Sequence, residues 1–369
     1  DTLGEARELA QIAAIIGRGF SYELLKAASG YPEEHLARLL NRLIEQDIVS
    51  IENTSRGPVY LFRHTLLREM ACSNMLKKDR RKHHRRIARF LLKYHEEITP
   101  PERIAMHCEA GGDWNNAIVK YQEAGENAIQ AYNNNEATNH FRSAYQLTSH
   151  IADPNERGHL KLTAGIRLLS SIISVRGFQD EKVLEMITPL ENLCHDLPPT
   201  EEWFYTTFAL HFLRLYQADY RHADDLSALL INHAESTRNT FYRMLALIAR
   251  GTTRYWSGKN LECINDLNEA IALYDPELHS RTKTLIRSDL RLYCQCHTMH
   301  SYWQLGYLEK ATQLAFEIEA YASQISHTFS ECNVLIGTSN IMLLRGDIEM
   351  AQERLTRLLE LSTQYQLLI

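Results

Sequence analysis

The sequence predicts a mainly α-helical protein with a small helix-and-hairpin head and a long body of stacked helical hairpins. Turn-forming residues are scarce. The 16 Gly and 9 Pro together make up about 7% of the 369 residues, whereas average usage would give about 12%. Extended apolar runs are confined to residues 48–62. Beyond residue 101, pairs of small residues recur at intervals of about 40 residues, which is the signature of a helical repeat.

The first 76 residues have the element order of a winged helix. Apolar side chains at helical spacing predict helices over 9–16, 21–29 and 36–44. Two extended runs, 48–51 and 59–62, flank the turn-rich segment 52–58. Three helices followed by a small β-hairpin therefore indicate a winged-helix domain over residues 1–76.

The charge of the third helix argues against DNA recognition by this domain. Between residues 31 and 47 the chain has four acidic side chains and only two arginines, Arg38 and Arg42. Helices that enter the major groove are usually basic, so we expect this one to pack against protein. Nucleic acid is then an unlikely partner, although a DNA-binding regulator that uses the winged helix and the basic run 77–86 stays open as the alternative.

The basic run opens the next segment, a helical arm with the first helical hairpins over residues 77–155. It allows two interpretations. The run could contact phosphate groups or nucleic acid through Arg80, Arg81, Arg85 and Arg86. It could also be a solvated helix face, because an apolar stripe continues through it to Tyr94. We favour the solvated face.

Residues 156–369 are expected to form an α-solenoid of tetratricopeptide-like hairpins. Small residues recur five positions apart at Ala218/Ala223, Gly258/Cys263, Gly306/Ala311 and Gly346/Ala351, and already at Gly112/Ala117 in the preceding segment. The first member lets the chain turn tightly, and the second lies where two helices cross closely. Gly251 lies seven residues before its turn glycine, as in the tetratricopeptide repeat.

The repeat geometry also predicts an inner surface on the first helix of each hairpin. We expect it to bind a protein or a small-molecule ligand, because aromatic side chains supply contact area. The same stripe would equally serve as the core of the solenoid, and both interpretations stay open. The residues of the predicted groove are Tyr205, Phe208, Phe212, Thr252, Tyr255, Tyr293, His300, Trp303, Asn333 and Asn340.

No pattern of catalytic or cofactor-binding residues is present. The sequence has no P-loop and no dinucleotide fingerprint, so we expect neither catalytic residues nor a cofactor in this chain. Cys294 and Cys296 project about 200° apart on a helix, which leaves only Cys296 and His300 on one face and predicts no metal site. The seven scattered cysteines suggest reduced thiols. No apolar run approaches the roughly 18 residues that span a bilayer, and we expect a cytoplasmic protein without membrane contact.

Residues 12–147 resemble the region that follows the ATPase module in the signal-transduction ATPases with numerous domains, a bacterial family often fused to adenylate cyclases or transcription-factor domains. The stretches that carry the resemblance are IIGRGF (15–20), LLNRL (39–43), FRHTLLRE (62–69), RKHHRRIA (81–88), PERIAMH (101–107), AGENA (124–128) and NEA (135–137). They cover about the first 40% of the chain.

The resemblance implies a regulatory role for a piece of a longer protein. In such a protein a nucleotide-binding module would precede the winged helix, arm and repeat sensor. The Phe62-Arg63-His64 motif would place His64 near the phosphates of ATP or ADP, which the parent protein would bind with Mg. The repeats would bind a ligand or partner, and the winged helix and arm would relay that event to the upstream ATPase module. A passive interaction scaffold is a further alternative.

Overall fold

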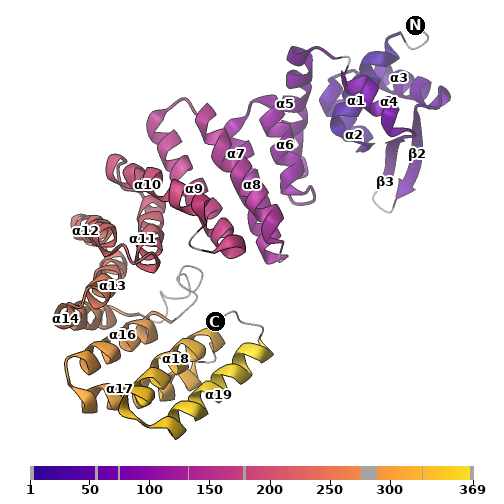
Figure 1. Cartoon of the computed structure of the whole chain (residues 1–369). Coiled ribbons are helices and arrows are strands. Elements are labelled where there is room, and N and C mark those ends of the chain that lie inside the picture. Colours follow the sequence, from indigo (N-terminus) through magenta and orange to yellow (C-terminus); the bar gives the residue numbers. More distant parts are fainter. Residues whose placement is uncertain are drawn as a thin grey trace. The chain divides into compact units, whose positions relative to one another are not determined.

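The structure is a computed structural model that describes residues 4–54, 57–73, 75–131, 133–177, 180–275, 289–325 and 327–365 (Figure 1). The chain divides into two compact units, Asp1–Gly177 and Phe178–Ile369. Among the described residues, none of the helices combines the length and the apolar character that a membrane crossing requires.

The first unit begins with three helices and a three-stranded antiparallel sheet in winged-helix order. In chain order the elements are α1 (Ala6–Ile16), β1 (Gly19–Ser21), α2 (Tyr22–Ser29), α3 (Glu33–Glu45), β2 (Val49–Thr54) and β3 (Gly57–Phe62). Ser21 accepts a hydrogen bond from the backbone N–H of Leu24 and so caps α2, and Gly30 ends that helix with φ of 70°. The expected fold class, mainly α-helical with a small sheet, is confirmed.

The sheet is larger than the sequence indicates. Strand β1 pairs with β3, which places β3 between the other two strands. Strands β2 and β3 stay paired out to Thr54 and Gly57, so much of the expected turn-rich segment is strand. The tip at residues 55–56 lies outside the described residues. Gly19 permits this pairing because a Cβ there would lie 2.8 Å from Cδ2 of Leu61.

Seven further helices follow in the described part of the first unit. They are α4 (Thr65–Ser73), α5 (Lys77–Tyr94), α6 (Pro101–Gly111), α7 (Trp114–Gln130), α8 (Asn134–Leu147), the short 3-10 helix η1 (Thr148–His150) and α9 (Pro154–Arg176). The core of the head continues without a break into Ile87 and Leu91 of α5 and Ile104 of α6. The head and the arm therefore share one hydrophobic core.

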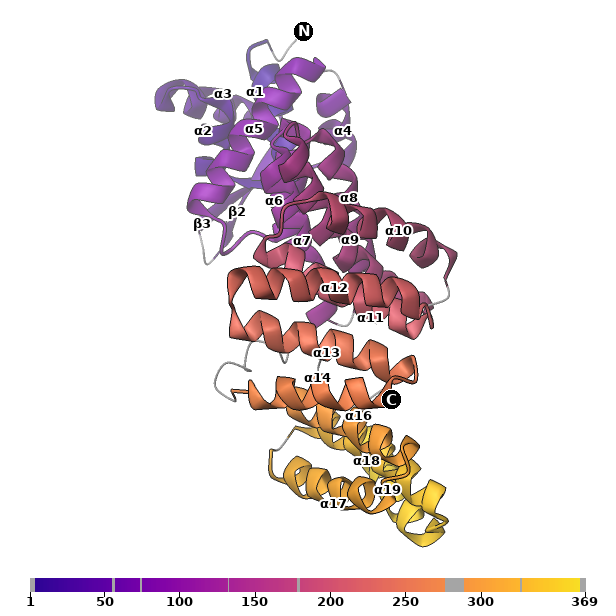
Figure 2. The same ribbon diagram turned by 90° about the vertical axis from the view of Figure 1, so that its left-hand side faces the viewer.

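The second unit is a stack of helical hairpins. Figure 2 shows α12, α13 and α14 lying side by side. The helices are α10 (Glu181–Asp196), α11 (Glu201–Tyr216), α12 (Tyr220–Thr237), α13 (Thr240–Trp256), α14 (Asn260–Ala272), α16 (Leu290–Gln304), α17 (Leu308–Gln324), α18 (Thr328–Arg345) and α19 (Ile348–Gln364).

The predicted turn residues all adopt the same left-handed conformation. The φ angles are 75° at Gly112, 58° at Ala218, 76° at Gly258, 84° at Gly306 and 82° at Gly346. The next residue in each case donates a backbone hydrogen bond of 2.8–2.9 Å to the carbonyl five positions earlier, which closes a Schellman motif. The second member of every pair is buried, so the physical basis proposed for the repeat is confirmed.

Candidate ligand groove

The predicted groove residues come from the first helices of four successive hairpins, α11, α13, α16 and α18. Phe208 and Thr252 are buried in the solenoid core, whereas Asn340 is exposed. The remaining predicted residues are partly buried: Tyr205, Phe212, Tyr255, Tyr293, His300, Trp303 and Asn333. The stripe therefore serves both purposes that the sequence left open, because part of it fills the core and part of it reaches the surface.

Six rings form a continuous chain across three of these helices. Ring centroids lie 5.0 Å apart between Phe208 and Phe212, and 6.1 Å apart between Phe212 and Tyr293. The chain continues from Tyr293 to His297 at 4.6 Å and from His297 to Tyr255 at 5.1 Å. It ends at His300, 6.3 Å from Tyr255. We call these six residues the ring chain.

His297 is the member of the ring chain that the sequence did not single out as a groove residue. It lies one helical turn after Tyr293. That spacing is the only signal that could have identified it, because its contact with Tyr255 joins residues 42 positions apart along the chain.

Both histidines of the ring chain have a defined tautomer. Nδ1 of His297 donates to the carbonyl of Tyr293 at 3.0 Å, and Nδ1 of His300 donates to the carbonyl of Cys296 at 2.8 Å. Burial lowers the pKa of His297 to about 4 and also lowers the pKa of His300. Both rings are therefore neutral at pH 7, and their Nε2 atoms can only accept hydrogen bonds.

The ring chain lies on a face without formal charge. None of the predicted inner positions on α11, α13, α16 and α18 carries Lys, Arg, Asp or Glu. Burial raises the pKa of the Cys296 thiol to about 12, so this sulfur is no nucleophile at neutral pH. The face offers aromatic area and hydrogen-bond acceptors, which suits an uncharged ligand.

The described residues contain no cluster of three His, Cys, Asp or Glu side chains that could hold a metal ion. The six cysteines whose side chains are described are all free thiols, and the side chain of Cys72 lies outside the described part. The lack of a metal centre, of a cofactor and of catalytic residues stays an expectation.

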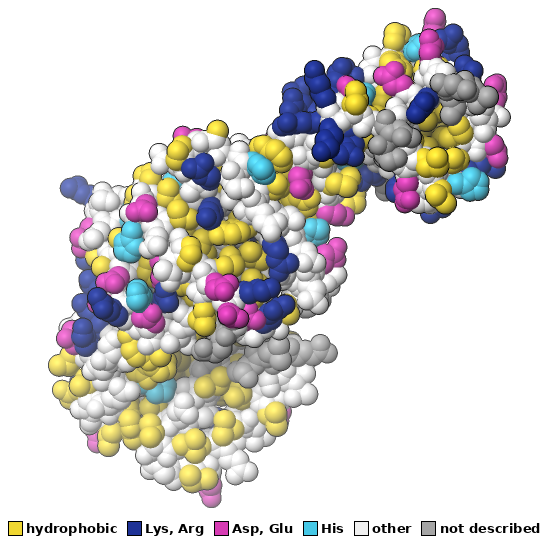
Figure 3. Space-filling view, turned by 45° about the horizontal axis from the view of Figure 1, so that its top comes forward, with side chains coloured by type: hydrophobic (Ala, Val, Ile, Leu, Met, Phe, Trp, Pro, Cys, Tyr) yellow, Lys and Arg dark blue, Asp and Glu magenta, His cyan; other side chains and the backbone are white. Residues whose placement is uncertain are grey.

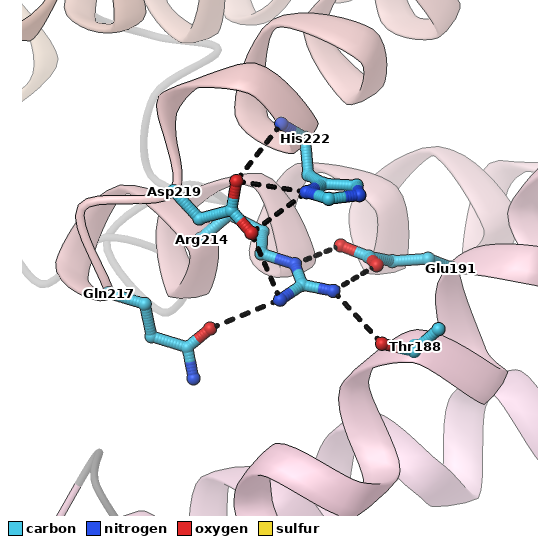
Figure 4. Close-up of polar contacts among 6 residues, drawn as sticks. All are labelled: Thr188, Glu191, Arg214, Gln217, Asp219 and His222. Carbon is cyan, nitrogen blue, oxygen red and sulfur yellow. Dashed lines mark hydrogen bonds and ion pairs between the residues drawn. The ribbon is translucent and has the colours of Figure 1, made fainter.

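Helix α10 is fastened behind α11 by a buried ion pair (Figure 4). The guanidinium of Arg214 contacts both carboxylate oxygens of Glu191, with Nε 2.5 Å from Oε1. It also lies 3.3 Å from Oδ2 of Asp219 and donates to Oγ1 of Thr188 at 3.2 Å. The hydrogen bonds to Glu191 raise the pKa of Arg214 against the opposing effect of burial. This network holds the helix that carries Phe208 and Phe212.

Trp303 belongs to a different hollow. It lines a depression of about 700 Å³ together with α17 and the end of α18, where Phe316 and Leu344 are 44% and 59% exposed. Asn333 and Asn340 lie on α18, a helix that contributes none of the six rings. The predicted groove is thus divided, and the ring chain is its best-formed part.

The basic run of the first unit lies on α5, and three of its arginines contact helix ends. Nε of Arg81 and Nε of Arg85 donate to the carbonyl of Gly111, at 3.3 and 3.2 Å. Nη1 of Arg86 donates to the carbonyl of Ser29 at 2.7 Å. Arg80 is exposed. Cations at the C-terminal ends of α2 and α6 also complement the negative end of the helix dipole.

His64 lies immediately before α4 and is exposed. Its carbonyl accepts the backbone N–H groups of Leu67 and Arg68, which begins the helix. The exposed imidazole is available to a neighbouring module, so the role that the resemblance implies for His64 stays a prediction.

The chain is similar to known proteins at low identity. No protein-family model matches it. An uncharacterized protein of Rhizobium meliloti (strain 1021) is 21% identical over 371 residues, which cover 99% of this chain and 36% of that protein. The chain thus spans about a third of the length of this relative.

Of two similar solved structures, one supports the helical-repeat fold, because it alone reaches a TM-score of 0.50. Aspartyl phosphate phosphatase F from Bacillus subtilis superposes with a TM-score of 0.50 at 11% identity, over 98% of this chain and 94% of that one. A signal transduction ATPase with numerous domains and a tetratricopeptide repeat sensor, from Pyrococcus horikoshii, gives a TM-score of 0.44 at 14% identity, over 98% of this chain and 57% of that one. At these identities the first likeness establishes the fold alone.

Proposed function

We propose that this chain is the sensor and relay part of a signal-transduction ATPase with numerous domains. The repeats bind an uncharged peptide segment of a partner protein, and the winged helix and arm pass that event to a nucleotide-binding module outside this chain. ATP or ADP with Mg belongs to that module. The observation that carries the proposal is the ring chain, a partly exposed aromatic surface on three first helices.

The chemistry of the ring chain selects the ligand class. The neutral Nε2 atoms of His297 and His300 accept hydrogen bonds, and the backbone N–H groups of an extended peptide can donate them. A charged side chain would find no counter-ion at the predicted inner positions of the repeats. Apolar peptide side chains can instead pack against the rings of Phe212 and Tyr255.

A relay needs a rigid connection between the arm and the head, and three side chains supply one. Arg103 of α6 donates to the carbonyl of Ile16 at 3.0 Å, at the end of α1. Nδ1 of His83 donates to the carbonyl of Ala28 at 3.0 Å, and Arg86 binds the next carbonyl. We call these three hydrogen bonds the clasp. Together with the shared core, they make the arm and the head move as one body.

The surface beside His64 suits contact with another module. Leu66 and Leu67 on α4 are 70% and 37% exposed, which leaves apolar area to be covered by a partner. We assign this face of α4 to the nucleotide-binding module. A ligand at the repeats then alters the ATPase only if it binds one state of the parent protein more tightly than the other.

The test compares groove variants in the full-length parent protein. The partner should change the ATPase rate of the parent protein, and we expect Phe212→Ala and Tyr255→Ala to weaken that change. Tyr307→Ala serves as a control, because Tyr307 is 49% exposed in a turn outside the ring chain. If the partner left the ATPase rate of the unsubstituted parent protein unaltered, the chain would be a passive scaffold. A full response in the groove variants would contradict binding at the ring chain. Nucleotide titration of this chain alone is the second measurement, and micromolar binding of ATP would contradict the division of roles.

A further inference from the structure

Helix α5 carries an exposed cationic face whose charge is not balanced by an ion pair among the described residues. Nine of its 18 residues are Lys or Arg, against the single acid Asp79. Eight of the nine are exposed, at positions 77, 78, 80, 81, 82, 85, 89 and 93. None of these side chains forms an ion pair with a described acidic residue. Figure 3 shows Lys and Arg side chains gathered over α5.

This arrangement destabilises the helix that bears it. Like charges stand four residues apart repeatedly, for example Lys78 with Lys82 and Arg85 with Arg89, and each such pair destabilises the helix. Lys77, Lys78 and Arg80 also lie in the first turn, where cations oppose the helix dipole. An ordinary solvated face mixes both signs of charge, and α5 does not.

The cationic face is held in a defined orientation. Arg81 and Arg85 are anchored through Nε to the carbonyl of Gly111, which leaves their Nη groups as further donors. The opposite face of the helix is buried through Ile87 and Leu91. Since α5 is fixed on that side, the outward side chains Lys78, Lys82 and Arg89 form one stripe along its axis.

We propose that this face of α5 binds the phosphate backbone of a nucleic-acid duplex without sequence preference. The exposed residues of α5 are all charged apart from Tyr94 at its end, so the face lacks the apolar anchors on which protein interfaces depend. Phosphate contacts need no such anchors, because counterion release drives them. The acidic helix α3 is not involved, and the inference is independent of the proposed sensor function.

The experiment measures anisotropy of two labelled duplexes of unrelated sequence, each about 20 base pairs long, with the full chain. We expect equal affinities that fall steeply between about 50 and 200 mM salt, with a slope of log K against log salt of roughly −4 to −5 for five phosphate contacts. The variant Lys78→Gln/Lys82→Gln/Arg89→Gln should flatten that slope by about 2–3, since each contact contributes about 0.9.

The control carries the same charge change in the other unit, as Lys182→Gln/Arg221→Gln/Lys259→Gln, at exposed positions. It should bind the duplexes as the unaltered chain does, although both variants make the net charge of −6 more negative by three. Circular dichroism checks that both variants stay folded. The proposal is wrong if no duplex binds at about 50 mM salt, if both variants lose affinity equally, or if poly-glutamate binds α5 as tightly as the duplex does.

Discussion

Ala218 adopts a backbone conformation that the other repeat turns reserve for glycine. Its φ of 58° lies in the left-handed region, and its side chain is exposed. An L-residue with a Cβ pays about 1–2 kcal/mol there. We expect Ala218→Gly to raise the free energy of unfolding by roughly 1 kcal/mol, less the entropy that glycine adds to the unfolded chain.

Urea unfolding of the full chain measures this effect. Ala223→Gly is the matched control, because Ala223 lies buried inside α12, where glycine should cost about 1 kcal/mol. If Ala218→Gly destabilised the chain as much as the control does, the left-handed turn would not be strained.

The buried pair between Glu191 and Arg214 should dominate the stability of the α10–α11 packing. Glu191 is 5% exposed, and its loss leaves the guanidinium without its main partner. We expect Glu191→Gln to cost about 3–5 kcal/mol, as for other broken buried pairs. The double variant Glu191→Leu/Arg214→Met should recover most of that loss in the same unfolding assay. A double variant no more stable than Glu191→Gln would show that packing, and not the unpaired charge, accounts for the cost.

At the scale of elements, close crossing of α13 and α14 depends on Gly251. A Cβ at this position would lie 2.6 Å from Cδ2 of Leu267 and 3.3 Å from Cβ of Asp266. We expect Gly251→Ala to destabilise the second unit by about 1–3 kcal/mol through overpacking. Because Leu267→Ala removes the side chain that the new Cβ would meet, the two substitutions should be less than additive in thermal unfolding. Strict additivity would contradict the crossing.

The sequence predicted the repeat hairpins well because the residues that determine each turn lie close together along the chain. Turn residues with positive φ and buried small partners are fixed by neighbours within five positions, and all five pairs behave as expected. Strand β1 was missed because Gly19-Phe20-Ser21 is extended only through its pairing with residues 59–61. The anchoring of Arg81, Arg85 and Arg86 was also missed, since their acceptors lie 26 to 57 positions away in sequence.

The candidate site was predicted in part for the same reason. Helical spacing identified Phe212, Tyr255, Tyr293 and His300 as one face, and the structure links them through ring contacts. Spacing could not separate them from Thr252, which faces the core with no exposed area. That distinction depends on how neighbouring hairpins rotate, and a single repeat contains no information about it.

For the whole molecule, the division at Gly177 predicts two folding units. Fragments 1–177 and 178–369 should each unfold cooperatively, because each has its own set of internal contacts. Their summed helical circular dichroism should equal that of the full chain. Unfolded fragments would show that the units stabilise one another. A fragment pair cut after residue 131 serves as the comparison, since it separates α7 from α8 and should not fold.

Buried histidines should make the whole chain sensitive to acid. Burial lowers the pKa to about 4 at His84 and His297 and to about 3 at His107 and His211. The unfolded chain binds these protons near pH 6.5, so stability is complete above that pH and is lost as the pH falls toward 4. The urea concentration at the midpoint of unfolding should therefore be lower at mildly acidic pH than at neutral pH. His84→Gln/His107→Gln should flatten the dependence in the first unit, and a pH-independent midpoint would contradict the burial.

The clasp between head and arm constrains how the sequences of these two parts can diverge. Its donors are three particular side chains, His83, Arg86 and Arg103, but every acceptor is a main-chain carbonyl. Any amino acid at positions 16, 28 and 29 that keeps its helix end in place offers the same oxygen. For these three hydrogen bonds the head needs only its backbone in place, whereas the arm must keep its side chains. The hydrophobic core that head and arm share constrains the apolar residues of both.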